Sequence, residues 1–157
     1  MVRLVAMRDS EFEQYMQRDI QTYAEENVKA GYWLPTTALE KSRKVHDALL
    51  PDGLATKDHH FFNIQDDERG EVIGTVWLKV DRDPSTQSGF IYELFIEEAF
   101  RRKGYATQAM LALQEKAKEL GLRALVLHVF AHNRAAIALY AKLGYEIKSL
   151  NMTKDLT

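Results

Sequence analysis

The sequence predicts an α/β fold of the mixed α+β type, in which helices flank a central twisted sheet that is mostly antiparallel. Apolar residues recur at helical spacing in four segments and follow strand patterns in six others. A short polar turn, Asp66–Gly70, joins two strands and favours an antiparallel pair, whereas a helix between two later strands requires a parallel pair. A length of 157 residues suits a single domain, residues 1–157.

The first half of the chain contains a short strand, two helices and three strands. Asp9 and Ser10 are good N-cap residues for the first helix, which Gly31 ends, and Pro51 stops the second. Aromatic and β-branched residues on both sides of the polar turn predict a hairpin. The expected elements are a strand Val2–Met7, helices Glu11–Ala30 and Ala38–Leu50, and strands His59–Gln65, Glu71–Asp81 and Gly89–Ile96.

The second half alternates helices with strands. An apolar stripe spaced by four, three, four and three residues predicts an amphipathic helix from Ala106 to Leu120, ended by Gly121. A strand follows at Leu125–Phe130. Asn133 can cap a helix that runs through Leu143 and stops at Gly144. Tyr145–Met152 is expected to form a last strand.

Composition excludes several classes of protein. With 21 basic and 23 acidic residues the net charge is -2, so no nucleic-acid or membrane partner is expected. The chain has no cysteine, which excludes disulfides, a thiol nucleophile and thiolate metal sites. Met1–Asp9 lacks the apolar region of a signal peptide, and no apolar run reaches the ~20 residues of a bilayer span. We therefore expect a cytoplasmic protein.

The histidines do not predict a metal site. His59 and His60 alternate across a strand, so the two side chains cannot easily face one ion. No pair of histidines has helical metal-ligand spacing with an acidic partner, and His128 reads as a strand residue. We expect no metal cofactor.

The turn after the third apolar strand has the chemistry of an anion site. A helix N-terminus leaves N–H groups unpaired and carries partial positive charge, which suits a phosphate. Gly104 has no Cβ and lets the backbone approach a ligand closely, and Ala106 is small for the same reason. Positive charge and a hydroxyl donor come from Arg101, Arg102, Lys103 and Thr107. The spacings of the P-loop and of the dinucleotide-binding turn are both absent.

Two motifs together resemble those of the GNAT acetyltransferase superfamily. The first is Glu93–Ile96 followed by Phe100–Ala106 and an amphipathic helix, and the second is Asn133–Glu146, about 30 residues further on. The resemblance covers roughly Glu71 to Met152. Earlier stretches, Tyr23–Glu26, Lys29–Gly31 and Trp33–Pro35, together with Leu127–Asn133, resemble the bacterial YycN-type members of the superfamily, which extends the resemblance to nearly the whole chain.

The resemblance implies a GNAT-like fold whose strands splay apart at an acetyl-CoA site. It implies that backbone N–H groups of the turn hold the pyrophosphate, and that the free edge of the preceding strand pairs with the pantetheine arm. A residue from the last helix adds a further contact. Carried over to this chain, the cofactor-binding residues are Leu94, Phe95, Ile96, Arg101, Arg102, Lys103, Gly104, Tyr105, Ala106, Thr107 and Asn133.

The implied activity is direct transfer of an acetyl group to a primary amine of a small molecule or peptide. The amine must lose a proton before it attacks, and the resemblance implies Glu93 as the base. A backbone N–H of Phe95 or Ile96 would stabilise the carbonyl oxygen, and Tyr140 would protonate the leaving thiolate. A solvent-facing Glu93, a core Tyr140 and an Asn133 that only caps its helix remain alternatives.

The sequence leaves the acceptor open. The family forms its acceptor pocket from the first two helices, their loop and the last strands, and here Glu25, Glu26 and Trp33 either meet a cationic amine or belong to an exposed helix face and the core. A non-catalytic acyl-CoA-binding or interaction module on the same fold is the alternative function, and O-acetylation or transfer of a longer acyl group is a third. The oligomeric state, a homodimer included, is also open.

Overall fold

The computed structural model describes all 157 residues and has a five-stranded sheet with the strand order β1-β2-β3-β4-β5. The first four strands are antiparallel neighbours and β4 pairs with β5 in parallel, as the sequence predicts. The strands and helices are β1 (Val2–Ala6), α1 (Asp9–Lys29), α2 (Ala38–Leu49), β2 (His59–Asp66), β3 (Val72–Asp81), β4 (Ser88–Ile96), α3 (Tyr105–Glu119), β5 (Ala124–Leu127) and α4 (Arg134–Lys142). Two short 3-10 turns lie at Gly53–Ala55 and Glu98–Phe100.

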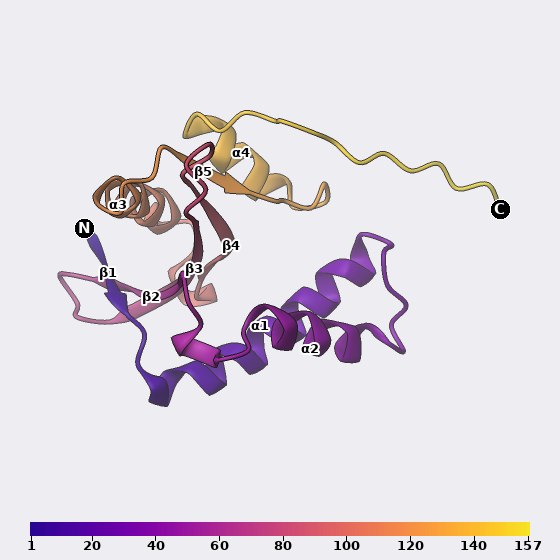
Figure 1. Cartoon of the computed structure of the whole chain (residues 1–157), viewed down its shortest axis with the longest axis horizontal. Coiled ribbons are helices and arrows are strands. Elements are labelled where there is room, and N and C mark those ends of the chain that lie inside the picture. Colours follow the sequence, from indigo (N-terminus) through magenta and orange to yellow (C-terminus); the bar gives the residue numbers. More distant parts are fainter.

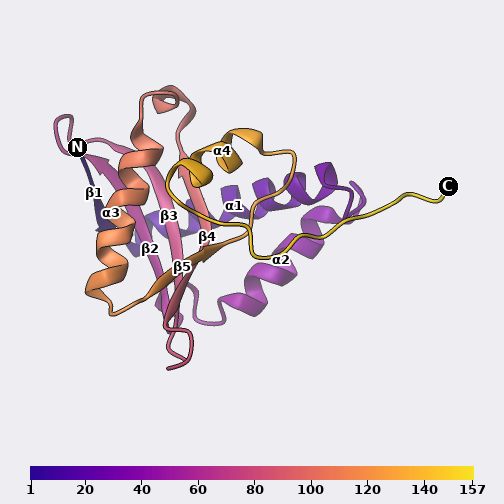
Figure 2. The ribbon, with the colours of Figure 1, turned by 90° about the horizontal axis from the view of Figure 1, so that it is seen from above.

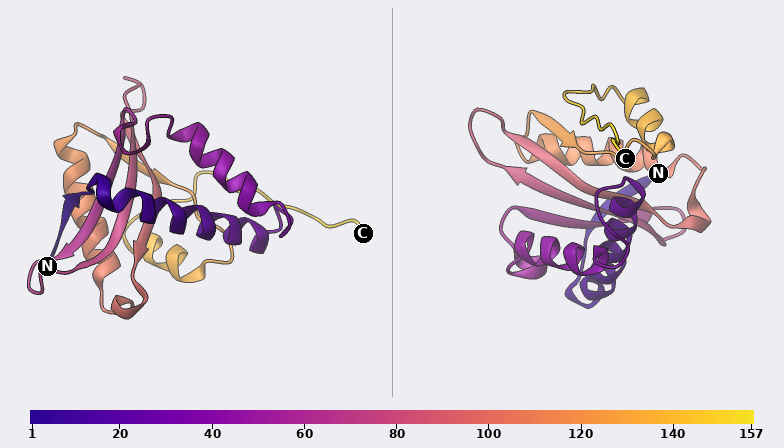
Figure 3. Two further views of the ribbon diagram at one scale, coloured as in Figure 1. Left: turned by 90° about the horizontal axis from the view of Figure 1, so that it is seen from below. Right: turned by 90° about the vertical axis from the view of Figure 1, so that its right-hand side faces the viewer.

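The sheet separates two layers of helices. Helices α1 and α2 cover one face, and α3 and α4 lie on the other (Figure 1; Figure 3, right). Each face has its own apolar cluster. Ile73, Leu78 and Ile91 pack with Met110 and Leu113 of α3 on one side, whereas the other cluster consists of Met7, Tyr15, Leu50, Phe61 and Trp77. None of the helices combines the length and apolar composition that a bilayer span requires.

Most of the expected helix ends are confirmed. Gly31, Gly121 and Gly144 all have positive φ just past a helix, the conformation that glycine adopts most easily. The Asn133 side chain accepts a hydrogen bond from the N–H of Ala136 and caps α4. The N-caps expected for α1, Asp9 and Ser10, are wrong by one and two residues. The helix already starts at Asp9, its N-cap is Arg8, and the Glu11 carboxylate accepts a hydrogen bond from the backbone N–H of Arg8.

The expected strand at Tyr145–Met152 is wrong. These residues have no regular secondary structure, and the chain runs away from the body of the molecule (Figure 1, Figure 2). The residues Ile147, Leu150 and Met152 are 73%, 73% and 91% exposed. A strand requires a neighbour for its backbone hydrogen bonds, and the only backbone bond near this segment joins the N–H of Tyr145 to the carbonyl of Tyr140. The other departure is smaller: β5 ends at Leu127 rather than Phe130.

Candidate active site

Strands β4 and β5 diverge along their length. They pair only from Ser88–Ala124 to Ile91–Leu127, so the second half of β4 has no neighbour on that side. The register of β3 and β4 shifts between Trp77 and Leu78, because Trp77 faces Glu93 whereas Leu78 faces Ile91. This bulge leaves Tyr92 unpaired and turns both Tyr92 and Glu93 toward α1 and α2. The ring of Tyr92 stacks on Trp77, with 4.6 Å between the ring centroids.

The turn that follows β4 presents a row of unbonded backbone donors. Arg102 and Gly104 have φ of 63° and 82°, and Gly104 is the N-cap of α3. Alternation of left-handed residues with ordinary ones forms a concave backbone nest that suits an anion. No backbone or side-chain acceptor takes the N–H groups of residues 102–107. A Cβ built at Gly104 would meet no atom within 4 Å, so the nest opens to solvent.

Some side chains of the turn are exposed, and others anchor it to the rest of the protein. Arg102 and Lys103 are exposed beside the nest. Arg101, in contrast, folds back: its Nε donates to the carbonyl of Ile96 at 2.8 Å, and its guanidinium lies 5.4 Å from the centre of the Phe95 ring. The Tyr105 hydroxyl donates to Asp66 Oδ2 at 2.6 Å and ties the start of α3 to the end of β2. Neither of these anchoring contacts was apparent from the sequence.

Glu93 is buried rather than solvent-facing. Its side chain is 11% exposed, and one carboxylate oxygen accepts a hydrogen bond from the Thr75 hydroxyl at 3.0 Å. Arg18 reaches the other oxygen at 3.4 Å and also donates to Thr75. Burial, followed by the nearby carboxylate of Asp19, raises the pKa of Glu93 well above its ordinary 4.5. A carboxyl with a raised pKa is suited to accept a proton near neutral pH.

A buried pair behind Glu93 links α1 to α2. His46 Nε2 lies 2.7 Å from Asp19 Oδ2, and His46 Nδ1 lies 2.8 Å from the carbonyl of Ser42. A carbonyl only accepts, so Nδ1 carries a proton there. Burial opposes charge on both residues, but their mutual hydrogen bond raises the pKa of His46, and hydrogen bonds from Glu93 and His46 lower the pKa of Asp19. His46 therefore favours the imidazolium form against an Asp19 carboxylate.

Asp19 and His46 are not among the site residues expected from the sequence, although the sequence carries a signal for Asp19. Tyr15, Asp19 and Tyr23 are four residues apart and share one stripe of α1, so an acid interrupts an otherwise aromatic stripe. The Tyr15 hydroxyl is buried without a hydrogen-bond partner. Burial and the neighbouring charges of Glu93 and Asp19 raise its pKa.

Tyr140 lies half-buried on α4 and packs against the apolar cluster under α3. Its ring centroid is 5.6 Å from that of Tyr145. Burial raises its pKa, which keeps the phenol protonated at neutral pH. Tyr140 therefore contacts the core and also carries a proton that it can donate. The two interpretations that the sequence left open, a core aromatic and a proton donor, are compatible with each other.

The tip formed by α1 and α2 approaches the segment between β5 and α4. His132 pairs with Glu26 of α1, and the rings of Tyr32 and Phe130 lie 6.4 Å apart. Trp33 is half-buried and packs edge-on against Tyr23, with 5.5 Å between centroids. Glu26 is thus paired rather than free, and these contacts connect the first helices to the residue before Asn133.

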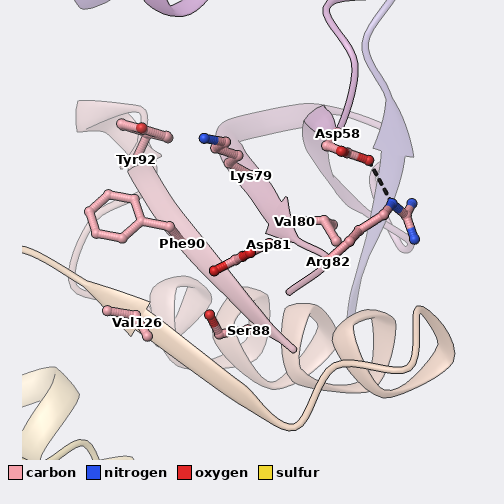
Figure 4. A pocket seen from close by; sticks show the side chains of 9 residues that line it. All are labelled: Asp58, Lys79, Val80, Asp81, Arg82, Ser88, Phe90, Tyr92 and Val126. Carbon is pink, nitrogen blue, oxygen red and sulfur yellow. Dashed lines mark hydrogen bonds and ion pairs between the residues drawn. The ribbon is translucent and has the colours of Figure 1, made fainter. Parts of the chain in front are cut away.

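A hollow also lies away from the turn. It has a volume of about 470 Å³ and is formed where β3 ends and β4 and β5 begin, at the opposite end of β4 from the turn (Figure 4). Phe90, Tyr92 and Val126 line it together with charged side chains, among which Arg82 bonds to Asp58 at 2.7 Å. No group of three or more histidines, aspartates or glutamates in the structure is arranged to hold a metal ion.

The fold, the diverging strands and the open nest define an acyltransferase class of protein, and comparison with known proteins identifies the family. The profile of the Acetyltransferase (GNAT) family matches residues 11–145, and the chain belongs to that family. It is 40% identical to YdgE of Bacillus subtilis over 150 residues and 40% identical to YycN of the same organism over 155 residues, both uncharacterized N-acetyltransferases. These matches cover 96% and 99% of this chain and 95% and 99% of the relatives.

Solved structures confirm the fold. The crystal structure of YycN from Bacillus subtilis superimposes with a TM-score of 0.96 at 39% identity, and the match covers 100% of this chain and 99% of YycN. The exposed residues after α4 are therefore included. AAC(6')-Iy, in complex with a bisubstrate analogue built on CoA, matches with a TM-score of 0.63 at 17% identity over 100% and 99% of the two chains, which shows a shared fold.

Proposed function

We propose that this chain is an acetyl-CoA-dependent N-acetyltransferase that transfers the acetyl group to a primary amine of a small molecule or peptide. The observation that carries the proposal is the row of six free N–H groups at residues 102–107, directly after a strand whose edge is unpaired. The donors fit a pyrophosphate, and the edge fits the amide-bearing arm of coenzyme A. The 40% identity to two N-acetyltransferases supports the same reading.

In this proposal acetyl-CoA supplies an activated carbonyl carbon and a thiolate leaving group. Arg102 and Lys103 add positive charge beside the nest, and the unpaired edge at Leu94, Phe95 and Ile96 orients the arm. The carbonyl of Ile96 is already taken by Arg101, so its N–H and the backbone groups of Leu94 remain for the ligand. The backbone groups of Phe95 point the other way, toward Thr75 of β3, because successive residues of a strand alternate between its two sides. Of the two N–H groups expected from the sequence, that of Ile96 rather than that of Phe95 would therefore stabilise the negative oxygen that develops during transfer.

The proton steps are assigned to two side chains. Glu93 would take a proton from the ammonium, and the neutral nitrogen would then form its bond to the acetyl carbon. The carbon–sulfur bond would break with its electron pair going to sulfur, and the Tyr140 hydroxyl would give that sulfur a proton. The second proton, which the nitrogen loses as it becomes an amide, would pass through water to the Tyr140 oxygen and restore the phenol. The raised pKa values of both groups suit these roles, because a higher pKa makes the ionised Glu93 carboxylate a stronger base and keeps the Tyr140 phenol protonated until it donates.

A screen of amine acceptors tests the proposal. The chain has no cysteine, so a thiol reagent detects only the free coenzyme A that turnover releases. Amino acids, polyamines, aminoglycosides, amino sugars and peptides are each incubated with acetyl-CoA, and mass spectrometry of the product distinguishes an amide from an ester. We expect thiol release with at least one amine. Binding of acetyl-CoA without release on any acceptor would instead favour the non-catalytic acyl-CoA-binding module.

A further inference from the structure

The hollow at the end of β4 away from the turn opens on the same face of the sheet as Glu93. Trp77 belongs to the apolar cluster under α1 and α2, and side chains two residues apart on a strand share a face, so Lys79 lies on that face too. Phe90 is paired with Lys79 in the register of β3 and β4, as Glu93 is with Trp77. Lys79 and Phe90 both line the hollow of about 470 Å³ (Figure 4). The proposed base and the hollow are thus neighbours along one face.

Tyr92 connects the base to the hollow. It is the neighbour of Glu93 at the bulge of β4, and its side chain lines the hollow. Its ring stacks on Trp77 with 4.6 Å between centroids and lies edge-on to Phe90 with 4.7 Å between centroids. A row of aromatic rings therefore leads from the base into the hollow, and it offers an apolar surface to the alkyl chain of an acceptor.

Lys79 is the charged side chain of the hollow that has no partner. Arg82 Nε donates to Asp58 at 2.7 Å, and this hydrogen bond lowers the pKa of the Asp58 carboxyl. The Asp81 carboxylate accepts two hydrogen bonds from the loop that follows β3. Lys79 Nζ takes part in neither an ion pair nor a hydrogen bond, and its side chain is directed toward Tyr92 (Figure 4). The charge that the hollow offers to a ligand beside Tyr92 is therefore one cation.

The spacing between the base and this cation sets the length of a ligand that reaches both. Trp77, which is level with Glu93, and Lys79 are two residues apart on β3, which corresponds to about 7 Å. A chain of about five methylene groups between an amine and a carboxylate covers that distance. With the amine at Glu93, the methylene groups would lie over Tyr92 and Phe90 and the carboxylate would reach Lys79.

We propose that this hollow is the subsite for the far end of the acceptor and that the acceptor is an ω-amino carboxylate. Its amine reaches Glu93, and its carboxylate accepts a hydrogen bond from the Lys79 ammonium. This inference rests on the proposed function and narrows its acceptor to one class of amine. An acceptor with no anion leaves Lys79 without a partner, and an acceptor with a second ammonium is repelled there.

A series of amines with one chain length tests the subsite: 6-aminohexanoate, hexylamine and 1,6-diaminohexane. For the natural chain, kcat/KM should be about 10-fold higher for 6-aminohexanoate than for hexylamine, and lowest for 1,6-diaminohexane. Lys79→Glu should reverse the order of the carboxylate and the diamine, because the charge of the subsite is reversed. The matched control is Lys118→Glu, the same change on α3 at the other face of the sheet, which should keep the natural order.

An NMR titration with 6-aminohexanoate gives a readout that does not depend on turnover. The amide signals of Ser88, Phe90 and Val126, which line the hollow, should shift in the natural chain and stay in place in Lys79→Gln. An order of acceptors that Lys79→Glu leaves unchanged, or the absence of these shifts in the natural chain, would overturn the subsite. Shifts at the hollow without turnover of any amine would support the subsite and count against the proposed function, so the two failures are distinguishable.

Discussion

The guanidinium of Arg18 lies 3.4 Å from the Glu93 carboxylate and 3.6 Å above the ring of Phe95. One side chain of α1 thus contacts two residues of β4 on the unpaired stretch. Its positive charge opposes the effect of burial on the Glu93 carboxyl, whereas Asp19, the next residue of α1, reinforces that effect. Two neighbouring residues therefore adjust the proposed base in opposite directions.

Charge removal at these two positions should move the pH profile in opposite directions. Glu93 must be ionised to accept a proton, so turnover rises as pH rises through its raised pKa. Arg18→Gln removes a charge that lowers this pKa and should move the acid limb to higher pH. Asp19→Asn removes a charge that raises the pKa of Glu93 and should move the acid limb to lower pH. Burial is unchanged in that variant and still holds the pKa of Glu93 above its ordinary 4.5. The profile of kcat/KM over pH measures both, and shifts of equal sign would contradict the assignment of Glu93.

Glu93→Gln should lower kcat about 100-fold, since general-base catalysis contributes roughly that much or more. It should also abolish the acid limb while the affinity for acetyl-CoA is retained. The matched control is Glu71→Gln, the same change at an exposed carboxylate beside β3. Steady-state kinetics of the two variants make the comparison, and a normal acid limb in Glu93→Gln would eliminate Glu93 as the base.

Tyr140→Phe should lower turnover about 10- to 100-fold, because the sulfur loses its proton donor while the ring stays in the core. Calorimetry should find acetyl-CoA binding unchanged. Tyr145→Phe is the control, because Tyr145 is the neighbouring tyrosine, with a pKa raised by burial to about 12. Full turnover by Tyr140→Phe would refute the acid role.

Gly104→Glu should weaken acetyl-CoA binding at least 100-fold, since a carboxylate would occupy the nest and repel the pyrophosphate. Its control is Gly121→Glu. Gly121 has nearly the same φ, 79° against 82°, and the same open space around its Cβ position, but lies at the other end of α3. Both changes impose similar backbone strain, so a titration calorimeter isolates the effect of location. Equal affinity in the two variants would argue against the nest as the pyrophosphate site.

The buried pair of His46 and Asp19 should make stability depend on pH. The folded pKa of His46 is raised, so its contribution is complete below 6.5 and is lost as pH rises through the folded value. The folded pKa of Asp19 is lowered, so its contribution to stability is complete above pH 3.8 and is lost only as pH falls through the folded value below 3.8. His46→Gln should cost about 3 kcal/mol near pH 6 and remove the fall at higher pH. Denaturant unfolding across pH measures this, with His132→Gln in the exposed pair to Glu26 as the control.

The sequence predicts local structure well where one residue type decides it. The positive-φ glycines, the cap at Asn133 and the periodicity of α3 are all local, and each is confirmed. The turn at Gly104 is likewise determined by local sequence. Tyr145–Met152 has an equally good strand pattern and was predicted wrongly, because pairing depends on whether a neighbouring edge is within reach and no local pattern contains that information.

The burial of Glu93 and the charges around it could not be predicted from the sequence either. Its burial depends on the bulge at Tyr92, and the charges around it come from residues 75 and 74 positions earlier in the chain, Arg18 and Asp19. A pattern search finds an acid within a strand but not the residues that a distant helix brings to it. The motif therefore identified candidates, and only the fold explains why the pKa of Glu93 is raised.

Thermal unfolding with and without excess acetyl-CoA, with AMP as the control ligand, tests the central claim most directly. A ligand at 100 times its dissociation constant adds about 2.7 kcal/mol. For a chain of this size we expect Tm to rise by roughly 5 to 10 °C with acetyl-CoA and to stay unchanged with AMP. An unchanged Tm at millimolar acetyl-CoA would contradict the proposed cofactor and the site assigned to it.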